Sequence, residues 1–191
     1  MVTSVTLYLG LLALTALERG VELVLSARNA RRARAHGGVE SGRGHYPVMA
    51  GFHAAFLLAC GLEVVLLHRP FPGVAGWIAL AVVLLAQSLR YWAIATLGWR
   101  WNTRIVVLPG AAPVTGGPYR FVRHPNYLAV IAEMAALPLV HGAWLTALLF
   151  SAGNAWLLRV RIRAEERALG EPWQVAFASR PRFLPGGHGG H

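Results

Sequence analysis

The stretch YLAVIAEMAALPLVHGAWLTALLFSAGNAWLL, residues 127–158, decides the fold class of this chain. Two apolar runs, 127–140 and 143–158, flank the pair His141-Gly142. Long apolar runs are typical of helices in hydrocarbon, and the pair His141-Gly142, just after Pro138, is a break between two of them. The stretch therefore predicts a helical hairpin with a tight turn, whose first arm is short for a complete crossing of a bilayer.

Three further apolar runs precede the hairpin, at residues 3–27, 47–67 and 74–98. Each is long enough to cross about 30 Å of hydrocarbon as a helix of roughly 20 residues. Of the 191 residues, 55% are apolar and 14% are charged, whereas soluble domains are about 25% charged. We therefore expect an all-α integral membrane protein of about five transmembrane helices. Residues 1–98 would form three N-terminal helices, and residues 99–191 a C-terminal half with the hairpin and a cytoplasmic tail.

The arginines predict how the helices are oriented. Five arginines follow the first run, four follow the third and six follow the fifth, whereas the turns on the opposite side hold only Arg69. Basic residues collect on the cytoplasmic side of membrane proteins. We therefore expect an outside N-terminus and a cytoplasmic C-terminus. All basic residues are Arg and all acids are Glu, a bias typical of GC-rich codon usage, so the membrane is expected to be a bacterial inner membrane.

Composition also excludes several kinds of chemistry. The chain has no Lys and no Asp, and Cys60 is its single cysteine. A P-loop lysine, a Ser-His-Asp triad and an internal disulfide are therefore excluded. The net charge of +10 fits loops beside an anionic leaflet better than a nucleic-acid partner. No metal is expected, and His188 and His191 are interpreted as part of a flexible glycine-rich tail.

Charged residues interrupt the apolar runs. Arg19 and Glu22 lie three apart, so they can pair on one helix face. Two interpretations are open: an internal ion pair that fixes helix packing, or one wall of a polar substrate cavity. Glu63 and Arg90 are expected to snorkel toward opposite membrane interfaces.

A second group of polar residues precedes and follows the hairpin. Pro125 suits the first turn of a helix, which would place Arg123 and His124 at a helix N-terminus, a position that favours anions. After the hairpin, Arg161 and Glu165 share a helix face at a spacing of four. Since the hairpin is antiparallel, both clusters are expected at one membrane mouth. Interfacial anchoring by Arg and Tyr is the alternative.

These residues carry a resemblance to a known family. The pattern GPYRFVRHPNY at 117–127, an apolar hairpin, Asn154 and then RIRAEE at 161–166 resembles the isoprenylcysteine carboxyl methyltransferase family. Phospholipid N-methyltransferases and some sterol reductases share parts of this half. ERGVE at 18–22 and RWNT at 100–103 look like a bacterial branch that O-methylates alkylpyrones or alkylresorcinols beside type III polyketide synthases.

The resemblance implies S-adenosyl-L-methionine as the methyl donor, S-adenosyl-L-homocysteine as the product, and no metal. It also implies that residues 99–191 form the catalytic and cofactor-binding half. It implies that the cofactor is bound by Tyr119, Arg123, His124, Asn126, Tyr127, Asn154 and Glu166. The implied catalytic residues are Arg161, which would hold or ionise the acceptor oxygen, and Glu165, which would orient Arg161 or act as a base. The implied substrate residues are Arg19, Glu22, Trp101, Asn102 and Glu133. For Glu133, a pair with an interior Arg is the alternative.

Four functions are compatible with these residues. The first is O-methylation of a lipophilic acid, enol or phenol that reaches the site from the bilayer. The second is lipid N-methylation, for which Glu133 and Glu165 could recognise an amine. An NADPH-dependent sterol-type reductase and a non-enzymatic membrane protein are the others. Glycine and alanine on the helices are compatible with a dimer as well as with a monomer.

Overall fold

The computed structural model describes residues 2–42 and 45–183. The tail with His188 and His191 lies outside the described residues. The described part contains five α-helices and two short strands: α1 (Val2–Ala35), β1 (Val39–Ser41), α2 (His45–Leu66), α3 (Val74–Leu97), β2 (Ile105–Val107), α4 (Pro125–Leu139) and α5 (Trp144–Ala176). Two short 3-10 helices, η1 (Gly98–Arg100) and η2 (Gly117–Arg120), lie in the loops before and after β2. Each apolar run of the sequence is therefore a helix, as predicted.

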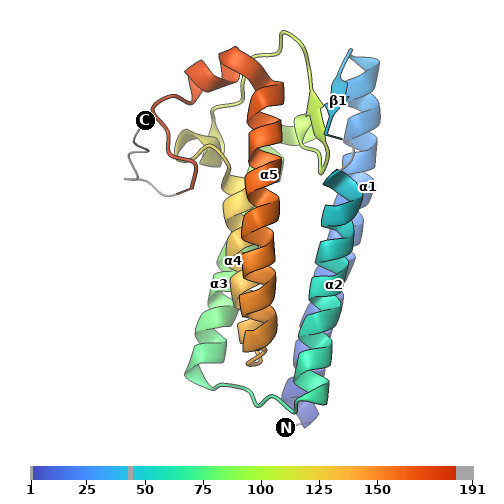
Figure 1. Ribbon diagram of the computed structural model, residues 1–191, viewed down its shortest axis with the longest axis vertical. Coiled ribbons are helices and arrows are strands. Elements are labelled where there is room, and N and C mark those ends of the chain that lie inside the picture. Colours follow the sequence, from blue (N-terminus) through green and yellow to red (C-terminus); the bar gives the residue numbers. More distant parts are fainter. Residues whose placement is uncertain (1, 43–44, 184–191) are drawn as a thin grey trace.

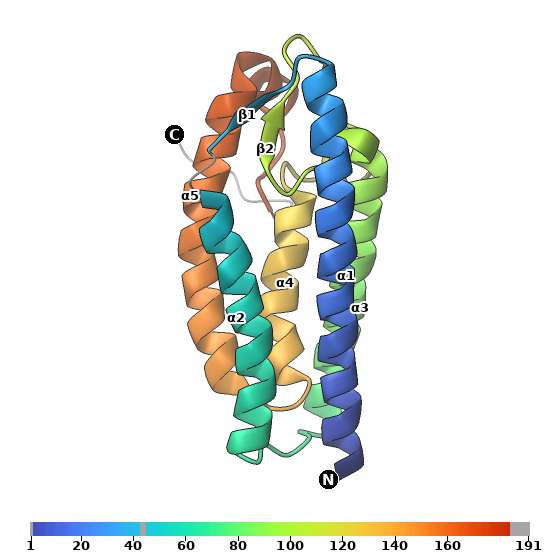
Figure 2. The same cartoon turned by 90° about the vertical axis from the view of Figure 1, so that its right-hand side faces the viewer.

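The helices run side by side along the long axis, and the N-terminus lies at the end opposite the two strands (Figures 1 and 2). The predicted hairpin is confirmed, because α4 and α5 pack together and are joined by a tight turn. Gly142 has φ 69° in this turn, a backbone conformation that favours glycine. The predicted helix start at Pro125, with His124 as the residue before it, is also confirmed.

Two helices of the described residues, over Tyr46–Leu66 and Val74–Arg100, are long and apolar enough to cross a membrane. Only 22% and 33% of their most apolar windows are buried inside the molecule. Apolar helices that expose most of their surface fit a lipid environment rather than water. Crossing by α1, α4 and α5 stays a prediction, as does the orientation in the membrane.

Two helices continue beyond their apolar runs. Helix α1 extends to Ala35 and α5 extends to Ala176. The added segment of α1 is rich in Arg and Ala, and that of α5 in Arg, Ala and Glu, which are strong helix formers even without apolar surroundings. Strand β1 pairs with β2 in antiparallel fashion, with Val39 opposite Val107. This pairing joins the α1–α2 loop to the α3–α4 loop over one end of the bundle (Figure 2).

The structure corrects the expectation that Glu63 and Arg90 snorkel. Arg90 is only 5% exposed and forms a short ion pair with Glu133 of α4. Glu63 is 8% exposed and accepts a hydrogen bond of 2.7 Å from the backbone N–H of Thr146, in the first turn of α5. Arg69 donates to Glu63 at 3.1 Å. Inside a bundle, pairing and helix capping stabilise a charge better than a long reach to the interface does.

Candidate active site

A cavity of about 1190 Å³ opens at the end of the bundle where β1 and β2 lie. Its walls come from the middle of α1, β1, the first half of α2, the second half of α3, the segment 97–114, the start of α4 and the second half of α5. Ligand pockets usually measure about 300–1,000 Å³. The cavity therefore has room for two ligands at once.

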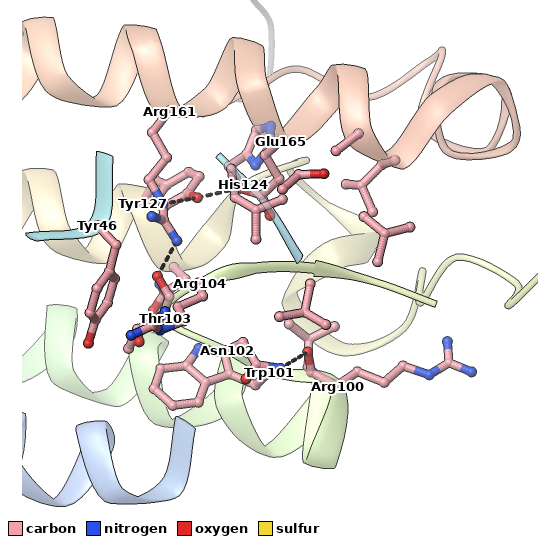
Figure 3. A pocket seen from close by; sticks show the side chains of 18 of the residues that line it. Tyr46, Arg100, Trp101, Asn102, Thr103, Arg104, His124, Tyr127, Arg161 and Glu165 are labelled. Atoms are coloured by element: carbon pink, nitrogen blue, oxygen red, sulfur yellow. Dashed lines mark hydrogen bonds between the residues drawn. The ribbon is translucent and has the colours of Figure 1, made fainter. Parts of the chain in front are cut away.

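Tyr127, Arg161 and Glu165 form the centre of the cavity (Figure 3). The Tyr127 hydroxyl donates a short hydrogen bond to Glu165 Oε2 and accepts one of 2.8 Å from Arg161 Nε. Arg161 is only 7% exposed. The two charged residues of α5 therefore converge on one site, as their spacing predicted, and they are linked through a phenol of α4.

Two further contacts hold the Arg161 guanidinium. One terminal nitrogen donates to the carbonyl oxygen of Thr103 at 2.5 Å, and the other lies 3.5 Å from the sulfur of Met49 in α2. The cation is thus fixed from α2, from α4 and from the loop before β2. A buried, immobile guanidinium is suited to binding a planar anionic oxygen group.

The start of α4 faces the mouth of the cavity and is backed by Glu166. His124 Nε2 lies 3.1 Å from Glu166 Oε1, and Arg182 donates two hydrogen bonds to this carboxylate, at 3.0 and 2.7 Å. Burial would raise the pKa of Glu166, but the hydrogen bonds from His124 and Arg182 outweigh it and lower the pKa to about 2. Glu166 is therefore ionised at neutral pH and stands behind His124, outside the cavity lining formed by the described residues.

Arg123 ties the chain after α5 to the start of α4. Its guanidinium donates to the carbonyl oxygens of Ala178 and Arg180, at 3.3 and 2.5 Å. Its backbone N–H donates to the carbonyl of Pro181 at 2.9 Å. Arg123 nevertheless lines the cavity, so it can both anchor this segment and contribute positive charge to the mouth.

Aromatic rings cover one side of the mouth. The His124 ring lies 5.3 Å from the ring of Tyr127 and 5.4 Å from that of Trp173, and Trp173 stacks on Phe177 at 4.9 Å. Trp173 and Phe177 reach this position because α5 kinks at Gly170, whose φ is 70° and ψ −166°, and bends over the end of the bundle (Figure 1). Neither ring is among the residues predicted from the sequence, although their spacing of four indicates a shared helix face.

The residues predicted from the first apolar run line the deep part of the cavity. Arg19 and Glu22 form an ion pair of 3.0 Å, and both belong to the cavity wall. The two interpretations of this pair are therefore compatible. Trp101 and Asn102 also line the cavity (Figure 3).

Besides Glu166, two predicted residues lie outside the cavity lining formed by the described residues. Glu133 pairs with Arg90, which agrees with the alternative of an interior ion pair, and it lies behind the cavity wall. Asn154 is 2% exposed and lies outside the cavity lining formed by the described residues. The oxygen of its side-chain amide is buried and has no hydrogen-bond partner among the described residues. The remaining predicted residues, Tyr119 and Asn126, line the cavity.

Comparison with known proteins finds a family and two relatives to which this chain is similar. The sequence model of the isoprenylcysteine carboxyl methyltransferase (ICMT) family matches residues 77–171. A protein of Bacillus subtilis (strain 168), recorded as "Uncharacterized protein YpbQ", is 41% identical over 162 residues, which cover 84% of this chain and 95% of that protein. An "Uncharacterized protein" of Haemophilus influenzae is 30% identical over 152 residues, 79% of this chain and 88% of that protein.

The family match places the chain among membrane methyltransferases. It belongs to the ICMT family, and the matched segment runs from α3 into the last part of α5. The segment contains the hairpin, the start of α4 and the Tyr127–Arg161–Glu165 centre. The predicted family is therefore confirmed, whereas membership of the bacterial branch with alkylpyrone acceptors stays a prediction.

Proposed function

We propose that the protein is an S-adenosylmethionine-dependent O-methyltransferase that acts on a lipophilic acceptor. The acceptor would be a prenylcysteine-like carboxylate or the hydroxyl of an alkylpyrone or phenolic lipid. The observation that carries this proposal is the Arg161 guanidinium, buried and held by three elements at the centre of a cavity large enough for a cofactor and an acceptor.

The mouth of the cavity suits the cofactor. The N-terminus of α4, with His124 and Arg123 beside it, offers backbone N–H groups and positive charge to the cofactor's carboxylate. Trp173 and Phe177 add an aromatic surface for the adenine to that of Tyr127. When bound, the cofactor supplies an electrophilic methyl group. Glu166 would act through His124, which it holds in place.

The centre of the cavity suits an acceptor oxygen. Methyl transfer to oxygen is an in-line displacement, which depends mainly on positioning and on an ionised acceptor. Arg161 would hold the acceptor oxygen as an anion, and Glu165 would orient Arg161 through Tyr127 or accept the acceptor's proton. A carboxylate arrives already ionised at neutral pH, whereas a phenol of pKa near 10 needs this help.

The side of the cavity between α1 and α2 suits a hydrocarbon tail. Small and apolar residues of both helices line it, among them Gly20, Ala54, Leu57 and Leu58. Leu58 is 67% exposed, so the apolar wall continues onto the outer surface of the bundle. We infer that the acceptor enters from the lipid between α1 and α2, while the cofactor enters from the cytoplasm.

O-methylation is favoured over N-methylation because the two carboxylates that could recognise an amine already have partners. Glu133 is paired with Arg90, and Glu165 accepts the Tyr127 hydrogen bond beside the Arg161 cation. A protonated amine at this centre would be repelled by Arg161. An anionic oxygen would be attracted to it.

The first test is calorimetric titration of S-adenosyl-L-homocysteine into the detergent-purified protein, with NADPH as the control ligand. We expect micromolar binding of the first and none of the second. Arg123→Ala and Glu166→Ala should weaken binding, whereas Arg161→Ala should leave it and slow turnover. Absence of binding to protein shown to be folded would overturn the proposal and favour a reductase or a non-enzymatic role.

A further inference from the structure

The loop between α3 and β2 is fastened to α1 by two buried polar side chains. Asn29 donates from Nδ2 to the carbonyl oxygen of Trp101 at 2.7 Å and lies 3.4 Å from that of Gly98. Ser26 Oγ accepts from the backbone N–H of Thr103 at 2.9 Å and lies 2.8 Å from the Thr103 hydroxyl. Both side chains belong to the interior rather than to the surface of the bundle.

Thr103 connects these contacts with α1 to the proposed reaction centre. Its N–H and hydroxyl face Ser26 of α1, and its carbonyl oxygen accepts the hydrogen bond from Arg161 of α5. One residue therefore connects a helix of the N-terminal half to the cation at the centre of the cavity. Neither Ser26 nor Asn29 is among the described residues that line the cavity.

We propose that Ser26 and Asn29 are positioning residues for methyl transfer, which set the orientation of Arg161 through the loop at 98–103. This inference rests on the proposed function, because it assigns Arg161 to the acceptor oxygen. The physical reason is geometric: a displacement of about 1 Å at a reacting group can lower a rate by roughly a hundredfold. Loss of either side chain removes a hydrogen bond that holds the loop on α1. The Thr103 carbonyl, which accepts from the Arg161 guanidinium, is then held less firmly.

The test compares turnover with cofactor binding in single and double variants. Ser26→Ala should lower kcat about tenfold or more, while the Kd for S-adenosyl-L-homocysteine changes less than about twofold, a change of roughly 0.4 kcal/mol. Ser26→Thr, which keeps the hydroxyl, should recover most of the rate. Asn29→Asp keeps the size but turns a carboxylate oxygen toward the Trp101 carbonyl, so it should lower kcat in the same way.

A double-mutant cycle with Arg161→Lys separates positioning from a general loss of structure. Lysine cannot reproduce the guanidinium's contacts with Tyr127 and Thr103, so Ser26→Ala should cost no further rate in that background. The matched control is Thr15→Val, another buried hydroxyl of α1, which bonds only to Leu11 of its own helix, at 2.9 Å, among the contacts of the described residues. It should leave kcat unchanged.

Two results would overturn the positioning role. One is wild-type kcat in both Ser26→Ala and Asn29→Asp; the other is an equal loss from Ser26→Ala with and without Arg161→Lys. If Arg161→Lys has no measurable rate, the single variants and the Ser26→Thr recovery decide. Failure of the proposed function looks different, because a wild-type protein that methylates no carboxylate, pyrone or phenol would contradict the function itself.

Discussion

At the scale of single residues, the hydroxyl of Tyr127 is the shared partner of two opposite charges. It accepts from the Arg161 cation and donates to the Glu165 carboxylate. Such a phenol fixes the distance between the charges, and it can pass a proton to the carboxylate when an acceptor loses one. Its ring also packs beside His124, so ring and hydroxyl have separable roles.

Tyr127→Phe should separate these roles. The variant keeps the ring but leaves Arg161 and Glu165 without their shared partner. We expect kcat to fall by about tenfold to a hundredfold, with little change in the affinity for S-adenosyl-L-homocysteine. Steady-state kinetics and calorimetry measure the two effects. Tyr8→Phe is the control, because the Tyr8 hydroxyl bonds to the Leu137 carbonyl at 3.2 Å, deep in the bundle core and away from the cavity lining.

Glu166 should give a pH-dependent contribution to stability. Its pKa in the folded protein, about 2, lies below the ordinary value of 4.5, so the folded state favours the carboxylate. The stabilisation is therefore complete above about pH 4.5 and is lost as the pH falls toward 2. The difference in Tm between wild type and Glu166→Gln should be large at pH 7 and smaller at pH 3. Glu171→Gln, at an exposed position of the same helix, should change Tm little at either pH.

At the scale of elements, α5 performs several tasks along its length. Its first turn is capped by Glu63 through the N–H groups of Leu145 and Thr146. Its middle carries Arg161 toward the cavity centre, and its last part turns at Gly170 over the mouth. The turn matters because a straight continuation would carry Trp173 past the cavity instead of onto His124.

Gly170→Ala should therefore weaken cofactor binding through the backbone. The position has φ 70° and ψ −166°, a region almost restricted to glycine that costs other residues about 1–3 kcal/mol. Space is not the obstacle, since the nearest atom to an added Cβ is Pro172 Cδ at 3.9 Å. We expect a Kd for S-adenosyl-L-homocysteine that is weaker by roughly tenfold, the equivalent of about 1.4 kcal/mol.

Gly10→Ala is the control for this substitution. Gly10 lies inside α1 with open space around an added Cβ, and alanine is favoured over glycine in a helix by about 0.5–1 kcal/mol. Cofactor affinity should not change, and Tm should stay or rise slightly. Unaltered affinity in Gly170→Ala would show that the kink does not place the aromatic wall.

At the scale of the whole molecule, the bundle separates two environments. The end with β1 and β2 carries the cavity mouth and the extended, arginine-rich ends of α1 and α5, whereas the opposite end holds the α2–α3 and α4–α5 turns (Figure 1). This asymmetry is the basis of the proposed orientation, with the cavity mouth in the cytoplasm.

Labelling of introduced cysteines should reveal the orientation. The natural Cys60 is 0% exposed, so we expect it not to react with the thiol reagent. A membrane-impermeant thiol reagent should label Pro72→Cys, in the exposed α2–α3 turn, in cells whose inner membrane is intact. Ala35→Cys, at the exposed end of α1, should react only after that membrane is permeabilised. The reverse pattern would contradict the proposed orientation and place the cavity mouth outside.

Much of the architecture could be predicted because it depends on neighbours along the chain. Hydropathy located all five helices, and Gly142 marked the hairpin turn. Spacings of three and four located the Arg19–Glu22 pair and the shared face of Arg161 and Glu165. These features need only the rise and twist of a helix.

Contacts between helices could not be predicted in this way. The sequence alone determined a helical membrane bundle of the ICMT type with two polar clusters at one mouth. Only the tertiary structure decided that Arg90 pairs with Glu133, that Glu63 caps α5, and that Thr103 holds Arg161. Such pairs depend on how far each helix is rotated about its axis and shifted along it relative to its neighbours. Hydrophobic periodicity alone does not determine that rotation and shift.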